Sequence, residues 1–278
     1  MRLDEERWIQ GRRLWLFFGV AVTLCVEFFF ARAFWTARTA RAVTVDVIQS
    51  KPADLFSMEV IQVTAGESRQ RRVYIYHTHT YEAYAMDDDN RYTPTETWRT
   101  ADENFNVVRV GAELAGLLRQ AGVFVTHDTT AYEPPKLSTA YSRSLAGLEN
   151  AAQEGYDLYI DLHRDSYSQG NGPNTVPVDG MDAARLLFLI GQGTGTDFDE
   201  KPDWEANQRA AEAISDALND RADGLSRGVS LKSGRSNQQA ATPSMLIEVG
   251  NNQNTRPQAL AAMEPLARAI CQYFDALD

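Results

Sequence analysis

Hydrophobic and polar positions follow two different periodicities along the chain after residue 70. Short apolar runs typical of strands occupy residues 73–77, 123–128, 157–163, 186–191 and 244–250. Between them, apolar positions recur every three to four residues, as in amphipathic helices, at 106–122, around 139–153, at 203–222 and from about 256. This alternation predicts an α/β fold for residues 71–278, a single three-layer domain with a largely parallel central sheet.

Signals for helix ends support these boundaries. Gly122 follows the first predicted helix as a C-terminal stop, and Asn254-Thr255 before Pro257 is typical of a helix start. One long irregular passage, residues 164–182, is rich in Gly, Asn and Pro and comes directly after a histidine. Because long loops inside compact domains are often functional, we expect this passage to border a site.

The N-terminal region has a different pattern, a continuous apolar stretch at residues 14–35. Its length matches the roughly 20 residues that cross a bilayer core, Trp15 and Trp35 stand at its ends, and Arg12 and Arg13 precede it. We therefore predict a cytoplasmic tail at 1–13, a transmembrane anchor at 14–35, and a stalk with an extended segment at 36–70. The domain at 71–278 would then lie outside the cell membrane, held by a single pass.

Two other interpretations of the apolar stretch stay open. A cleaved signal peptide shares the order of basic and apolar residues, but no small-residue cleavage site clearly follows. A buried core helix is the other, and Glu27 inside the stretch is the one feature that disfavours membrane insertion.

Charge and cysteine content exclude several classes of protein. The whole chain has a formal net charge of −11, although residues 1–41 hold seven arginines against four acids. The remainder is therefore strongly acidic and lacks the clustered basic surface of nucleic-acid binders, so we expect no nucleic-acid partner. The two cysteines, Cys25 and Cys271, provide neither a disulfide framework nor a cysteine-ligated metal site within residues 71–278.

All four histidines lie at the C-terminal ends of predicted strands, and such ends form the ligand-binding edge of a parallel sheet. They are His77, His79, His127 and His163. Glu248 ends the apolar run SMLIEVG, where an unpaired carboxylate would be costly unless it has a function.

Two imidazoles and one carboxylate form a common catalytic zinc shell that leaves a position for water. We predict a Zn²⁺ site formed by His79, Glu82 and His163, with Glu248 as the general base that later protonates the leaving amine. His77 shares a strand face with His79 and is the alternate histidine, while Glu103, before the first long helix, is the alternate carboxylate.

Each of these residues also has a structural interpretation. A single histidine at a strand end is more often hydrogen-bonded within the fold than bound to metal. Glu103 could simply favour a helix N-terminus. The prediction of a metal site depends on finding several such residues along one edge.

Six strings in this order, YIYHTHTYEAY, NVVRVGAELAGLL, VTHDTT, AYSRSL, DLHRDS and MLIEVGNNQNT, together resemble the stage II sporulation protein P family. The resemblance covers about residues 71–278 and extends more distantly to the zinc N-acetylmuramoyl-L-alanine amidases. The family usually has Ser before the first Glu, where this chain has Tyr81. The anchor before the catalytic domain is also similar to that family, although the stalk is short for it.

The resemblance implies a zinc-dependent peptidoglycan hydrolase that cleaves the N-acetylmuramoyl-L-alanine bond, with endopeptidase activity on stem-peptide cross-links also implied. Such activity remodels the cell wall, as in sporulation engulfment. Implied partners are peptidoglycan, a stage II sporulation protein D-like lytic transglycosylase and a stage II sporulation protein M-like membrane protein. Aligned with the distant amidases, Glu103 rather than Glu82 falls at their ligand carboxylate, so that choice stays open. The predicted substrate-binding residues are Arg143, Arg164, Asn237 and Gln238.

Two alternatives of other classes remain at this point. One is a catalytically inactive scaffold that binds the cell wall, and the other is a zinc peptidase that acts on stem peptides. The retained histidines and acids at strand ends argue against an inactive scaffold, while a peptidase would use the same metal chemistry.

Overall fold

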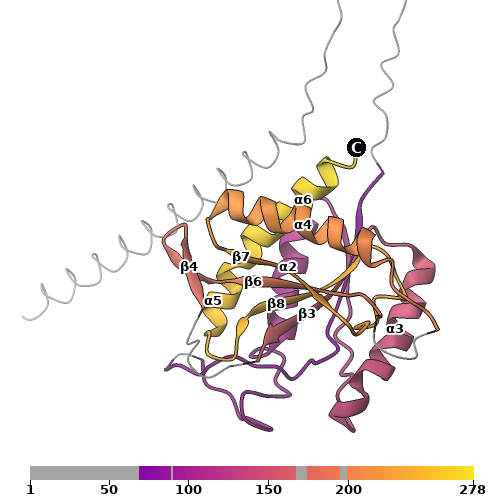
Figure 1. The fold of residues 1–278 in the computed structure, drawn as a ribbon. Coiled ribbons are helices and arrows are strands. Elements are labelled where there is room, and N and C mark those ends of the chain that lie inside the picture. Colours follow the sequence, from indigo (N-terminus) through magenta and orange to yellow (C-terminus); the bar gives the residue numbers. More distant parts are fainter. Residues whose placement is uncertain (1–68, 89, 167–173, 195–198) are drawn as a thin grey trace, which may run out of the picture. The chain divides into compact units, whose positions relative to one another are not determined.

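A six-stranded sheet forms the centre of the computed structural model, which describes residues 69–278 except 89, 167–173 and 195–198 (Figure 1). The strands are β1 (Arg72–Tyr76), β2 (Phe124–His127), β3 (Leu158–Asp165), β6 (Leu186–Gly191), β7 (Ser226–Lys232) and β8 (Ser244–Asn251). The helices are α2 (Val107–Gln120), η1 (Leu137–Thr139), α3 (Ala140–Glu154), α4 (Trp204–Arg221), α5 (Arg256–Ala261) and α6 (Met263–Asp275). The predicted anchor at 14–35 lies outside the described residues. None of the helices between residues 69 and 278 is apolar and long enough to span a bilayer.

The strand order is β2-β1-β3-β8-β6-β7. β1 runs parallel to β2 and β3, β3 runs parallel to β8, and β6 runs parallel to β7. Only the β6–β8 pair of this sheet is antiparallel. The predicted α/β domain with a largely parallel sheet is therefore confirmed.

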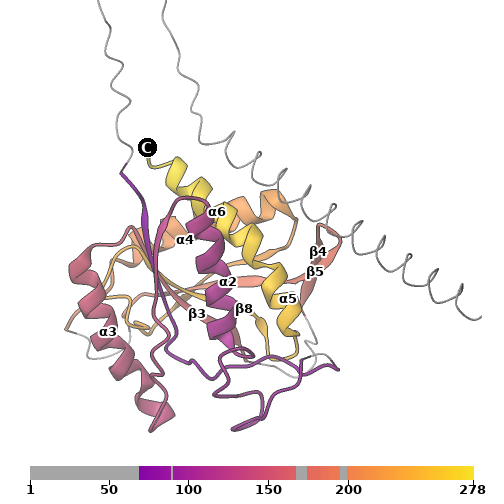
Figure 2. The ribbon, with the colours of Figure 1, turned by 180° about the vertical axis from the view of Figure 1, so that it is seen from behind.

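Helices cover the two faces of the sheet unequally. Val73 and Ile75 of β1 belong to the main core, together with buried residues of α2, α4, α5 and α6. Tyr74 and Tyr76 point the other way, into a smaller cluster with Leu148 of α3. Figure 2 shows α2, α5 and α6 in front of the sheet and α3 apart from them.

The structure differs from the sequence prediction at three places. Residues 175–184, inside and just beyond the passage expected to be irregular, form the hairpin of β4 (Thr175–Val178) and β5 (Met181–Ala184). β7 was not predicted, because its residues after Ser226 are only half-buried or exposed. The last helix is divided at Ala262, since Pro265 cannot donate to the carbonyl of residue 261 and is tolerated only in a first turn.

Candidate active site

His163 and Glu248 are neighbours across two parallel strands, β3 and β8, at the C-terminal end of β3. Both alternate with residues of the main core, Leu162 on β3 and Ile247 and Val249 on β8, so they face the side of the sheet that carries α3. Leu187 of β6 continues the same row on the other side of Glu248. The sheet itself therefore fixes the separation between a buried imidazole and a carboxylate.

A turn after β1 brings His79 and Glu82 to the same place. β1 ends at Tyr76, and the backbone N–H of Glu82 donates to the carbonyl oxygen of His79 at 3.2 Å. The rings of His79 and His163 meet edge to face with centroids 5.4 Å apart, and Oε2 of Glu82 lies 3.3 Å from Nδ1 of His163. The structure thus gathers His79, Glu82, His163 and Glu248 at one edge.

Asp161 secures that turn to the sheet. Its carboxylate accepts from the backbone N–H of Thr78 at 2.8 Å and from the Thr78 hydroxyl at 2.7 Å. Its Oδ1 atom also lies 2.7 Å from Nε2 of His163. Asp161 is nearly fully buried. Through these contacts it links the histidine of β3 to the turn that carries His79.

The carboxylates around His163 make this a strongly negative, cation-favouring position. Burial of His163 opposes its positive charge, but the carboxylates of Asp161 and Glu82 raise its pKa well above the usual range. Burial also acts to raise the pKa of Glu82, yet His163 and Arg164 lower it to about 2. The nearby carboxylates stabilise a positive charge here by more than burial disfavours it. A bound metal cation would be stabilised by the same carboxylates as the proton on His163.

A bulge in β8, opposite the end of β3, contributes to the placement of Glu82. The pairing of β3 with β8 shifts register between His163 and Asp165. At the shift, the backbone N–H of Arg164 donates to Oε2 of Glu82 at 3.1 Å. Such bulges redirect side chains next to active sites, and here the bulge ties the Glu82 carboxylate to the strand of His163.

Glu133, in the loop after β2, was not predicted as part of the site. Its side chain is 4% exposed, its Oε1 atom lies 3.4 Å from Nδ1 of His79, and it forms an ion pair with Arg99. A carboxylate on one ring nitrogen fixes the tautomer of a histidine and leaves the other nitrogen for a ligand. No periodicity or spacing in the sequence connects Glu133 with His79, since the contact arises from the path of the loop.

Glu248 has a carboxylate that is partly buried beside His163. Its Oε2 atom is buried and accepts no hydrogen bond from any residue that the structure describes. Burial raises its pKa to about 8, His163 opposes that rise, and Glu82 and Asp165 add to it. A carboxylate whose pKa lies near neutrality is suited to exchange protons with a reacting group.

His77 and His127 belong to the opposite face of the sheet. Nδ1 of His77 donates to the carbonyl oxygen of Leu162 at 2.8 Å, so its Nε2 accepts from Nε2 of His127, also at 2.8 Å. Burial lowers the pKa of His77 to about 4 and that of His127 to about 3. The expected sharing of a face by His77 and His79 is wrong, because β1 ends at Tyr76, before both residues, and the turn that follows redirects His79.

Helix α2 lies so close to this histidine pair that only glycine fits at position 111. A Cβ atom there would lie 2.6 Å from Nε2 of His77 and 2.8 Å from Nε2 of His127. We expect Gly111→Ala to lower the free energy of unfolding by about 1–3 kcal/mol, as overpacked core positions do. Urea unfolding followed by circular dichroism would measure it.

Gly116 provides the matched control in the same helix, since a Cβ atom there has no neighbour within 4 Å. Gly116→Ala should raise the free energy of unfolding by about 0.4–1 kcal/mol, because alanine loses less conformational entropy in a helix. Equal effects of the two substitutions would contradict the close approach of α2 to the histidines.

Glu103, the alternate carboxylate, is exposed in the loop before α2. The helix is capped by Asn106, whose side chain accepts from the N–H of Val108 at 2.9 Å. It is Glu82, buried and 3.3 Å from His163, that the structure brings to the other candidate ligands.

The four predicted substrate-binding residues form hydrogen bonds within the chain. Arg143 donates to the carbonyl oxygens of Tyr132, Glu133 and Lys136. Arg164, which is buried, donates to those of Ala83 and Trp98.

Asn237 donates to the carbonyl oxygen of Tyr141, and Gln238 bonds the backbone of β6 at Leu189 and Gly191. These contacts, like those of the two arginines, position loops around the site. A role for any of the four residues in binding substrate stays a prediction.

The donor set fits zinc in chemistry, although the side chains are not arranged as a closed ligand cluster. No group of three His, Cys, Asp or Glu side chains within residues 69–278, as far as the structure describes them, has the spacing of bound metal ligands. His163 and Glu82 instead form an ion pair. Two imidazoles and a carboxylate nevertheless meet, each imidazole has a carboxylate beside its other nitrogen, and this arrangement is typical of zinc-binding histidines.

Comparison with known sequences finds one family. The family described as stage II sporulation protein P (SpoIIP) matches residues 39–271. A curated stage II sporulation protein P of Bacillus subtilis (strain 168) is 25% identical over 227 residues, which are 77% of this chain and 53% of the relative. The chain therefore spans about half the length of that relative.

Comparison with solved structures finds amidases. The CwlD amidase from Clostridioides difficile, solved in complex with the GerS lipoprotein, has a TM-score of 0.51 and 13% identity, covering 74% of this chain and 100% of that chain. The N-acetylmuramoyl-L-alanine amidase AmiC2 of Nostoc punctiforme has a TM-score of 0.47 and 16% identity, covering 74% and 97%. At such identities, the likeness to the first shows a shared fold alone.

Proposed function

The chain belongs to the stage II sporulation protein P family, and from this premise and the site we propose that it is a zinc-dependent peptidoglycan hydrolase. Its membership confirms the resemblance of its motifs. The proposed reaction is hydrolysis of the amide bond between N-acetylmuramic acid and L-alanine, in cell-wall remodelling such as that of sporulation. The observation that carries the proposal is the pairing of His163 with Glu248 across adjacent strands, beside His79 and Glu82.

We assign the zinc ligands to His79, Glu82 and His163. Glu133 lies at Nδ1 of His79 and Asp161 at Nε2 of His163, so the opposite ring nitrogens are the ones left for a metal. A zinc ion held there would activate water and polarise the carbonyl group of the amide. Asp161 and Glu133 would keep both rings in the required orientation.

Glu248 is assigned the proton transfers. It does not belong to the ligand set, and its neighbour His163 fixes its distance from the ligands. As a carboxylate it would accept a proton from the attacking water, and as a carboxylic acid it would then donate that proton to the leaving amine of L-alanine. A pKa near 8 without metal, set by burial, indicates that both protonation states are accessible.

Digestion of purified peptidoglycan tests both the bond and the metal. With the full chain in detergent, mass spectrometry should find free stem peptides that begin with L-alanine, together with glycan that lacks them. Treatment with a chelator should abolish their release, and added Zn²⁺ should restore it, because the metal would activate the attacking water and polarise the carbonyl group of the amide.

Other products would support other activities. Smaller muropeptides with the stem peptide still attached to muramic acid would indicate the zinc peptidase instead. Binding of cell-wall fragments with no cleavage, with zinc present, would indicate the inactive scaffold. Release of stem peptides that persists after complete chelation would contradict the zinc assignment.

The anchor at 14–35, the extracytoplasmic location and the two protein partners stay predictions from the sequence. The anchor lies outside the described residues, and the B. subtilis relative is about twice as long as the matched region.

A further inference from the structure

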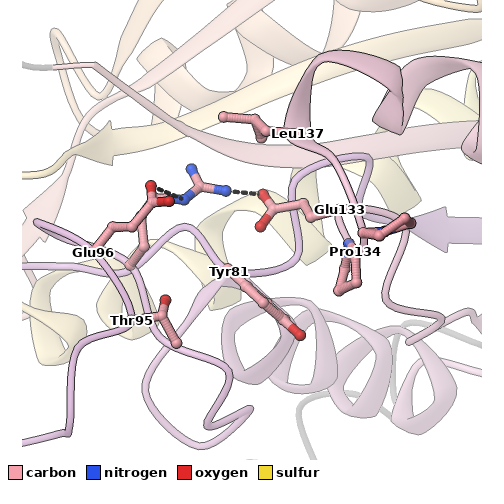
Figure 3. Close-up of a pocket in the computed structure, with 8 residues that line it drawn as sticks. Tyr81, Thr95, Glu96, Glu133, Pro134 and Leu137 are labelled. Atoms are coloured by element: carbon pink, nitrogen blue, oxygen red, sulfur yellow. Dashed lines mark hydrogen bonds and ion pairs between the residues drawn. The ribbon is translucent and has the colours of Figure 1, made fainter.

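A pocket of about 230 Å³ borders the candidate active site (Figure 3). Glu133 lines it and also contacts Nδ1 of His79, so one side chain links the pocket to the proposed metal ligands. The remaining lining residues come from the loops after β1 and β2 and from the start of η1. They are Tyr81, Thr95, Glu96, Arg99, Pro134, Pro135 and Leu137.

The pocket is lined by both apolar and charged side chains, and its net charge is negative. Tyr81, the two prolines and the partly exposed Leu137 offer apolar surface. The charged groups are two carboxylates and one guanidinium, which leaves one negative charge in excess. Figure 3 shows Glu96 and Glu133 reaching that same guanidinium, which is Arg99.

Glu133 has acceptor capacity that the chain does not use. Its Oε1 atom faces both Arg99 and His79. Its Oε2 atom is buried and accepts no hydrogen bond from any described residue. A carboxylate that is 4% exposed and only half satisfied is costly, and a ligand that donates a hydrogen bond would offset that cost.

We propose that this pocket binds the primary ammonium group of a diamino acid in the stem peptide, with its aliphatic chain against Tyr81 and Leu137. This inference rests on the proposed function, since it states that the stem peptide extends from the bond to be cleaved toward this pocket. An extended peptide advances about 3.3–3.6 Å per residue, so a residue a few positions after L-alanine can reach a pocket that adjoins His79. The ammonium group supplies the donor that Glu133 lacks and neutralises the excess negative charge.

The test uses two soluble muropeptides that differ only in whether the side-chain amine of the diamino acid is free or acetylated. Binding to the full chain in detergent is measured by calorimetry, and hydrolysis is measured separately. Acetylation should weaken binding about tenfold or more, because it removes a charged donor to a buried carboxylate. The same loss should occur in KM, while kcat stays unchanged.

Glu96→Gln is the informative variant, because Glu96 lines the pocket without contacting His79. It should weaken binding of the free amine by about threefold, as an exposed ion pair does, and leave binding of the acetylated muropeptide unchanged. Glu149→Gln, at an exposed position on α3, is the matched control and should change neither.

The outcomes separate the two proposals. Equal binding of the free and acetylated muropeptides would overturn the ammonium subsite, even if both are hydrolysed. A preference for the free amine that Glu96→Gln does not reduce would place the amine elsewhere and would also overturn it. Preferential binding that depends on Glu96, without hydrolysis of either compound, would support the subsite and contradict the proposed hydrolase.

Discussion

Replacing Glu248 by glutamine is expected to lower the rate of stem-peptide release by about 10²–10⁴-fold, the usual contribution of a general acid–base residue. Glutamine keeps the shape of the side chain but cannot accept the proton from water. Because Glu248 lies outside the proposed ligand set, the variant should retain its zinc. Release of L-alanine amino termini from peptidoglycan and elemental analysis of the same sample measure the two effects.

The control for this variant is Glu149→Gln, which makes the same chemical change at an exposed position on α3 and should leave hydrolysis intact. Undiminished hydrolysis by Glu248→Gln would remove Glu248 from the proton transfers. Loss of zinc together with activity would instead make Glu248 a ligand.

Replacing His163 by alanine should weaken zinc binding by at least about a hundredfold, since even the outer partners of a ligand contribute 10–100-fold. The zinc content of the purified chain should fall from about one ion per chain to a small fraction. Competition with a fluorescent zinc indicator gives the affinity directly. Full occupancy in this variant would contradict the assigned ligand set.

His163→Ala also leaves the buried carboxylates of Asp161 and Glu82 without their partner, so the variant could lose its fold. His79→Ala avoids this problem, because His79 is less buried and contacts neither of them within 4 Å. It should lose zinc while circular dichroism stays unchanged. His127→Gln is the matched histidine control, since His127 lies on the other face of the sheet, and it should keep its zinc.

The sequence was sufficient to predict the elements that carry the site. The strands β1, β3 and β8 are largely apolar, and all but one residue of each is buried, so their pattern is clear even though it does not reveal their order. That β8 lies next to β3, and so places Glu248 beside His163, results from tertiary pairing between segments far apart in the chain. The candidate residues could be predicted, but their distances could not.

The sequence left open which histidine and which glutamate are the candidate ligands, because these residues lie where the regular strand and helix patterns end. His77 and His79 could not be separated by alternation, because the strand ends at Tyr76 and alternation no longer applies. Glu82 and Glu103 both precede helix α2, and only the folded turn shows which of them is buried. Glu133 had no periodic signal, since its partners Arg99 and His79 belong to a different loop.

The two hydrogen bonds that Asp161 accepts from Thr78 limit the movement of the candidate site. The turn that carries His79 cannot move away from β3 without breaking these two buried hydrogen bonds. The turn with the proposed ligand His79 is therefore held firmly to the strand that carries His163. If the proposed function is right, adjustment to different cell-wall fragments must come from the surrounding loops, while the proposed reacting groups keep a fixed spacing from one substrate to the next.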